Sequence, residues 1–80
     1  MVSKEFLYEY LNAYSPVAQE SEGQKVWTDY LYKYVDEIHH DHYGTAYGVI
    51  KSGVKNAKKV VIEAHCDEIS WMISHIDSDG

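Results

Sequence analysis

Residues 60–69 read Val-Val-Ile-Glu-Ala-His-Cys-Asp-Glu-Ile, an apolar run that ends in a His-x-Asp pair. Short apolar runs of this kind are typical of buried strands in α/β proteins. Because side chains alternate along an extended chain, His65 and Asp67 should project from the same face. A carboxylate beside an imidazole fixes the tautomer of the ring and raises its basicity. The pattern therefore predicts a strand with a candidate metal ligand and its supporting acid at one end.

Each residue around this pair also has a plainer interpretation. His65 could be a histidine satisfied at a strand end beside a surface acid, since short motifs often match by chance. Glu63 falls on the same face and is either a buried, paired carboxylate or a rim residue facing water. Cys66 points to the opposite face and fits a small buried residue better than a zinc ligand. Glu68 is either an acid that supports the site or a solvated turn residue.

Upstream, the sequence predicts two helices. Ser3 can cap the first, which should end at Ser15 because a residue before proline avoids helical geometry. Residues 15–23 are small and polar, as in a loop. Residues 21–24, Ser-Glu-Gly-Gln, have the capping-box pattern and should open a second helix of about 14 residues. Its apolar stripe would comprise Trp27, Tyr30, Leu31 and Tyr34.

Four strands are predicted to follow the helices. Residues 38–43 and 45–51 should form a hairpin that turns at Gly44. Residues 60–64 would be the central strand and residues 69–76 another, which makes the fold class α/β. A sheet of this kind needs helices on both faces, and only two helices are predicted. With a turn-like Asp-Ser-Asp-Gly at residues 77–80, we expect residues 1–80 to be the N-terminal segment of a longer domain.

Composition excludes several classes of function. Thirteen acidic residues stand against seven lysines and no arginine, for a net charge of -6. This balance argues against a nucleic-acid partner and against binding to anionic membranes. No window approaches the ~20 apolar residues of a membrane span, and no signal-peptide pattern is present. The single cysteine, Cys66, can form no internal disulfide, so a cytoplasmic location is expected.

Two other groups of residues could carry function. Three histidines, His39, His40 and His42, lie around Asp41. On a strand, His40 and His42 would share a face, and such an i, i+2 pair could hold a metal weakly. Polar edge strands also use such residues, and two ligands fall short of the three or four that zinc needs. The eight tyrosines and two tryptophans fit core packing better than a stacking surface, because no basic groove accompanies them. His75, in the last predicted strand, is expected to be structural.

Residues 64–69, Ala-His-Cys-Asp-Glu-Ile, followed by Trp-Met-Ile at 71–73, resemble a known family motif. It is the Ala-His-x-Asp-Glu-Ile-Gly-Phe-Met-Val segment of the glutamyl-aminopeptidase-like, tetrahedral (TET) aminopeptidases. The upstream order of helix, Ser-Pro loop, helix and Tyr-Gly turn also agrees. Two departures are Ser70-Trp71 in place of Gly-Phe and a loop at residues 15–20 that lacks the family's common glycine.

The resemblance implies the N-terminal part of a mixed-sheet, zinc-peptidase-like catalytic domain. Two divalent metal ions, zinc or cobalt, would activate a water that removes N-terminal residues from short peptides. His65 would be a metal ligand and Asp67 the catalytic acid that orients it. The remaining ligands, the base and a dimerisation domain would lie beyond Gly80, so residues 1–80 alone should be inactive. A homo-oligomer, a dodecamer in the family, is also implied.

Two alternatives remain open at this point. An aminoacylase- or carboxypeptidase-like dimetal hydrolase also uses His-x-Asp at a strand end, although the Glu-Ile that follows favours the aminopeptidases. A small non-enzymatic α/β module could instead bind a partner through its aromatic helix face. That module would explain the acidic balance and the tyrosines without any metal.

Overall fold

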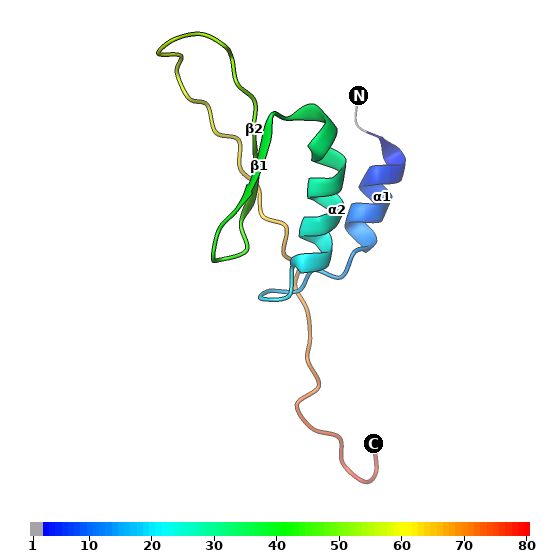
Figure 1. Cartoon of the computed structure of the whole chain (residues 1–80). Helices are drawn as coiled ribbons and strands as arrows, with labels where there is room; N and C mark the ends of the chain where they lie inside the picture. The colour runs from blue at the N-terminus through cyan, green and yellow to red at the C-terminus, as the bar shows by residue number, and fades with distance from the viewer. Residues whose placement is uncertain (1–2) are drawn as a thin grey trace.

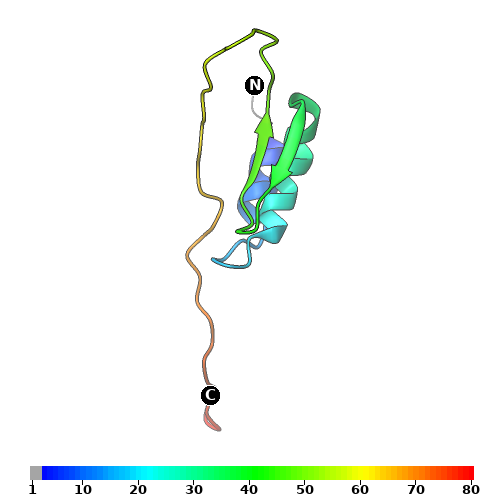
Figure 2. The ribbon, with the colours of Figure 1, turned by 60° about the vertical axis from the view of Figure 1, so that its left-hand side comes forward.

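The computed structural model describes residues 3–80 (Figure 1). Its elements are helix α1 (Lys4–Asn12), helix α2 (Ser21–Leu31), a 3₁₀ turn η1 (Tyr32–Tyr34) and strands β1 (Glu37–His40) and β2 (Ala46–Val49). The two helices lie side by side, and the hairpin of β1 and β2 packs against α2 on the side away from α1 (Figures 1 and 2). The α/β class is therefore confirmed at the level of two helices and one antiparallel hairpin. No helix within residues 3–80 is long and apolar enough to cross a membrane.

Both helices begin and end close to their predicted bounds, with one correction. The Ser3 hydroxyl accepts a hydrogen bond from the Phe6 amide at 3.2 Å, as expected of a cap. The predicted capping box at residues 21–24 is wrong, because Ser21 already lies inside the helix and Glu20 occupies the cap position without a side-chain bond. The Glu20 carboxylate instead accepts from the Ala18 amide at 2.8 Å, which closes the preceding loop.

Aromatic rings join the two helices. Phe6 of α1 stacks on Tyr30 of α2 with ring centroids 3.9 Å apart, and Tyr10 and Tyr34 extend the row. Trp27 and Tyr30 are half-buried, whereas Tyr34 is exposed, so the predicted apolar stripe is confirmed except at its last residue. The expectation that the tyrosines and tryptophans serve core packing thus holds only for Tyr10, Trp27 and Tyr30. The other six tyrosines and Trp71 are exposed.

The hairpin is paired in a single register, with Glu37 opposite Val49 and His40 opposite Ala46. The Asp41 carboxylate accepts the amides of Tyr43 and Thr45 at 2.8 and 2.9 Å, and so holds the turn. Gly44 follows with φ of +85°, a conformation that glycine adopts without a steric penalty. The predicted hairpin and its turn are confirmed, with strands somewhat shorter than expected.

The two later strands of the prediction, residues 60–64 and 69–76, are not strands in this structure. Both segments are extended and unpaired: residues 60–64 run back past the hairpin without pairing with it, and residues 69–76 lead away from the helices and the hairpin (Figures 1 and 2). A strand exists only when a neighbour accepts and donates its backbone hydrogen bonds. Within residues 3–80 the sheet contains only β1 and β2, so these segments have no paired neighbour. Their large side chains are consequently exposed, for example Ile62 at 95% and Trp71 at 98%.

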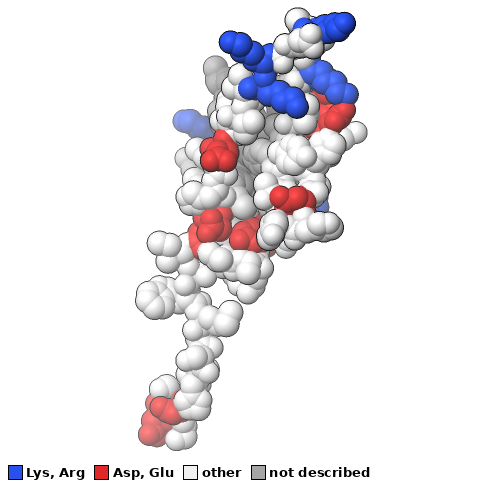
Figure 3. Space-filling model, turned by 90° about the vertical axis from the view of Figure 1, so that its left-hand side faces the viewer, with Lys and Arg blue, Asp and Glu red and all other residues white. Residues whose placement is uncertain are grey.

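Charges separate along the molecule. Lysine side chains gather at the upper end of the face in Figure 3, where the loop that follows β2 lies, and acidic side chains lie below them. That loop carries Lys55, Lys58 and Lys59. The described residues thus combine a small packed unit of two helices and a hairpin with a long extended segment that carries the His-x-Asp motif.

Candidate metal centre

The predicted His65–Asp67 pair is formed. The Nδ1 atom of His65 lies 3.0 Å from Asp67 Oδ1 and 3.0 Å from the Asp67 carbonyl oxygen. Because both neighbours are acceptors, the proton of the neutral ring belongs on Nδ1, which donates to them. Nε2 then keeps its lone pair and makes no hydrogen bond to any residue in the range 3–80. This tautomer is the one that a metal-binding imidazole needs.

Exposure differs within the pair. The His65 side chain is 84% exposed, whereas the Asp67 side chain is 38% exposed. The carboxylate therefore sits nearer to the helical unit and the ring reaches outward, as an open ligand position requires. The shared face predicted from the alternation of side chains is seen directly in the 3.0 Å contact.

Glu68 connects this motif to the loop after α1. Its amide donates to the Ser15 carbonyl at 2.8 Å, and its Oε1 accepts from the Ser15 amide at 3.1 Å. Sequence reasoning left Glu68 between a supporting acid and a solvated turn residue. The structure assigns it a specific long-range contact, and no signal in the local sequence could have identified its partner.

Cys66 is a free, half-buried cysteine. Burial raises the pKa of Tyr10 of α1, and the charge interaction of that tyrosine with Cys66 contributes to the rise. Burial raises the pKa of the Cys66 thiol, and the charges of Glu20 and Asp67 raise it further. Metals bind the thiolate, so a raised pKa disfavours ligation. The structure therefore favours the plainer of the two interpretations of this residue.

The remaining candidates lie apart from His65. Glu63 is exposed, in line with a rim residue facing water. His39 binds Glu37 at 2.9 Å and stacks on Tyr47, as on a polar edge strand. His75 contacts Asp77 at 2.8 Å, and both side chains are about three-quarters exposed. The structural role expected of His75 stays a prediction.

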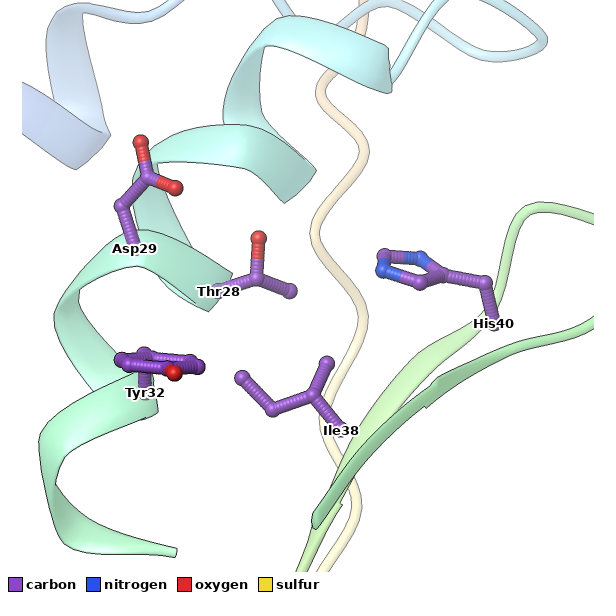
Figure 4. Close-up of a pocket in the computed structure, with 5 residues that line it drawn as sticks. All are labelled: Thr28, Asp29, Tyr32, Ile38 and His40. Carbon is purple, nitrogen blue, oxygen red and sulfur yellow. The ribbon is translucent and has the colours of Figure 1, made fainter.

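The groove between α2 and β1 is a separate feature. Figure 4 shows that the side chains of Thr28, Asp29 and Tyr32 face those of Ile38 and His40 across it. Neither His65 nor Asp67 lines this groove. Its imidazole is that of His40, from the predicted histidine cluster. His40 and His42 together line a second pocket, beside residues 18–21 and the start of α2, so this i, i+2 pair does share one pocket.

The donor set within the described residues falls short of what a metal pair requires. No group of three or more His, Cys, Asp or Glu side chains that could hold a metal occurs within the described range 3–80. A zinc ion needs at least three protein ligands. His65 therefore fits a single ligand position, with Asp67 as its hydrogen-bonded support, and other ligands would have to come from outside these residues.

Comparison with known protein families gives a match for the part of the chain that carries this motif. Residues 44–80 match the family model of the M42 glutamyl aminopeptidases. The match confirms the resemblance noted from the motif at residues 64–69, and it supports a peptidase-type function in broad terms. No solved structure matches the chain.

Proposed function

We propose, from the M42 glutamyl aminopeptidase match of residues 44–80, that this chain supplies a metal-binding histidine and its supporting aspartate to a metal-dependent aminopeptidase. The observation that carries the proposal is the His65–Asp67 contact at 3.0 Å, which leaves Nε2 of an exposed imidazole free to bind a cation. Peptide substrates, two zinc or cobalt ions and a homo-oligomeric assembly belong to the same proposal.

Each residue of the pair has a separate role in this proposal. His65 donates the Nε2 lone pair to one metal ion. Asp67 holds the proton on Nδ1, so the ring cannot turn or change tautomer, and its negative charge makes Nε2 a stronger donor. A bound pair of divalent ions would polarise the scissile carbonyl and lower the pKa of the attacking water.

The exposed segment that carries the pair supports a place within a larger catalytic domain. The apolar side chains of residues 60–62 and 69–76 are largely exposed, and large exposed apolar surfaces normally bind other protein surface. We propose that neighbouring strands and helices cover them and bring the remaining ligands and the base. Residues 1–80 alone are then expected to hydrolyse nothing.

The chain offers a matched control for testing His65. His75 and Asp77 have the same spacing on the same segment, but His75 contacts the Asp77 carboxylate through Nε2, at 2.8 Å, whereas His65 contacts Asp67 through Nδ1. In the full-length protein, His65→Ala should abolish hydrolysis of an aminoacyl substrate and lower the bound metal content, while His75→Ala should leave both near the wild-type level. Circular dichroism would establish that both variants keep their helices.

Two results would refute the proposed function. The first is a His65→Ala protein that keeps its metal content and its activity. The second is an equal loss in both variants, because this would assign the effect to the exposed segment in general. Asp67→Asn should weaken metal binding or activity by about 10–100-fold, the usual effect of losing a carboxylate behind a metal-bound histidine.

A further inference from the structure

We propose that Glu68 is a positioning residue that fixes the His65–Asp67 pair against the helical unit through Ser15. The inference rests on the proposed function for its catalytic consequence, but its structural content can be tested without it. The contact is reciprocal. Ser15 and Glu68, 53 positions apart, exchange two hydrogen bonds, one from each amide, and Pro16 and Glu68 form an isolated parallel bridge.

The partner of Glu68 is the most firmly packed point of the described chain. Only four residues in the range 3–80 are buried, and all lie at the junction between α1 and α2. They are Ala13, Ser15, Pro16 and Gly23. The Ser15 hydroxyl lies directly against Gly23 in the first turn of α2, where a Cβ would come within 1.9 Å of it. Glu68 is thus attached to the most buried part of residues 3–80.

The segment around Glu68 has little else to hold it. Residues 50–65 and 69–80 are exposed throughout, and those that make up the predicted strands are unpaired. Cys66 and Asp67 are half-buried, and both directly precede Glu68. The two hydrogen bonds of Glu68 therefore set where Asp67 lies, and Asp67 in turn sets the direction of the His65 ring.

The role proposed for Glu68 differs chemically from that of a ligand or a general base. Positioning needs only an acceptor oxygen of the right reach, because Oε1 accepts from an amide. A glutamine keeps that oxygen and loses the charge. A ligand or a base needs the carboxylate itself. Glu68→Gln and Glu68→Ala therefore separate the two roles.

The first measurement is amide hydrogen exchange at residues 15 and 68 in the purified chain, compared among wild type, Glu68→Gln, Glu68→Ala and Glu63→Ala. Glu63 is the control, since it is an exposed carboxylate on the same segment. In Glu68→Ala we expect exchange at the Ser15 amide to accelerate about tenfold, consistent with the loss of one hydrogen bond to a charged acceptor. Glu68→Gln and Glu63→Ala should stay within about threefold of wild type, as a neutral acceptor or a distant change allows.

The second measurement is peptidase turnover in the full-length protein. Glu68→Ala should lower kcat by about 10–100-fold, as for other groups that support a metal ligand, and Glu68→Gln should restore most of it. Unchanged exchange at Ser15 in Glu68→Ala would overturn the inference. So would a Glu68→Gln protein that keeps its protection but is as inactive as Glu68→Ala, because Glu68 would then act through its charge.

The two proposals can fail separately. If His65→Ala leaves turnover intact, the proposed function fails, yet the exchange data still decide whether Glu68 holds the segment. If exchange at Ser15 is unchanged in Glu68→Ala while His65→Ala abolishes turnover, the metal-binding role of His65 is supported and the positioning role of Glu68 is refuted.

Discussion

Substituting Gly23 by alanine tests the junction on which the helical unit depends. An ideal Cβ at this position would lie 1.9 Å from Ser15 Oγ and 3.1 Å from Ser15 Cβ. Normal separations between nonbonded carbon atoms are about 3.5–4.0 Å. The new methyl group must therefore displace the Ser15 side chain or separate α2 from the loop after α1.

The expected change in the free energy of unfolding on Gly23→Ala combines two opposing effects. Overpacking of a tight site typically costs about 1–3 kcal/mol. Alanine is favoured over glycine within a helix by up to about 1 kcal/mol, and Gly23 lies in the first turn of α2. We therefore expect Gly23→Ala alone to destabilise the chain by about 1–2 kcal/mol, with the clash outweighing the gain in helix propensity.

Ser15→Ala supplies the second corner of a double-mutant cycle. It removes Oγ, the atom in closest conflict, and leaves only the milder 3.1 Å approach of the two Cβ atoms. The buried Ser15 hydroxyl makes no hydrogen bond to any residue from 3 to 80, so its loss alone should cost little. In the Ser15→Ala background, Gly23→Ala should become neutral or slightly stabilising, which gives a coupling energy of about 1–2 kcal/mol.

Urea unfolding followed by far-ultraviolet circular dichroism measures all four corners of the cycle. Additive effects, with a coupling below about 0.3–0.5 kcal/mol, would refute the packing of Ser15 against Gly23. The backbone of Ser15 is unchanged in these variants, so amide exchange at Glu68 provides a second readout. It should accelerate in Gly23→Ala and return toward wild type in the double variant.

Two further predictions concern the hairpin. Gly48→Ala should destabilise the chain by about 1–3 kcal/mol, since its Cβ would lie 2.7 Å from Leu31 Cδ2 and 2.8 Å from Val35 Cγ1; an unfolding midpoint equal to wild type would contradict this close approach. The hydrogen bond from Lys51, followed by that from His39, lowers the pKa of Glu37. The ion pair across the strand ends should therefore stabilise the hairpin above the unfolded-state pKa of about 4.3 and lose this effect as pH falls through the lower folded-state pKa. A carboxylate titration by NMR that is identical in wild type and Lys51→Gln would exclude that cause.

The sequence predicted the contact between His65 and Asp67 but not the contact between Glu68 and Ser15. The i, i+2 spacing of His65 and Asp67 was enough to place them on one face, because alternation is a property of any extended chain. The same short motif, at residues 64–69, predicted the family that residues 44–80 match. Neither could indicate that Glu68 binds the loop at Ser15, since hydrogen bonds across 53 positions leave no periodic pattern.

By itself, the sequence determined those features that rest on interactions within a few residues. They are the α1 cap at Ser3, the turn at Gly44 and the pairing of His65 with Asp67. Tertiary structure decided the rest. Gly23 must lack a side chain because Ser15 packs on it, and residues 60–64 and 69–76 form no strands because no neighbour pairs with them within residues 3–80. The physical reason is that a local bond needs only its own segment, whereas packing and strand pairing need a second one.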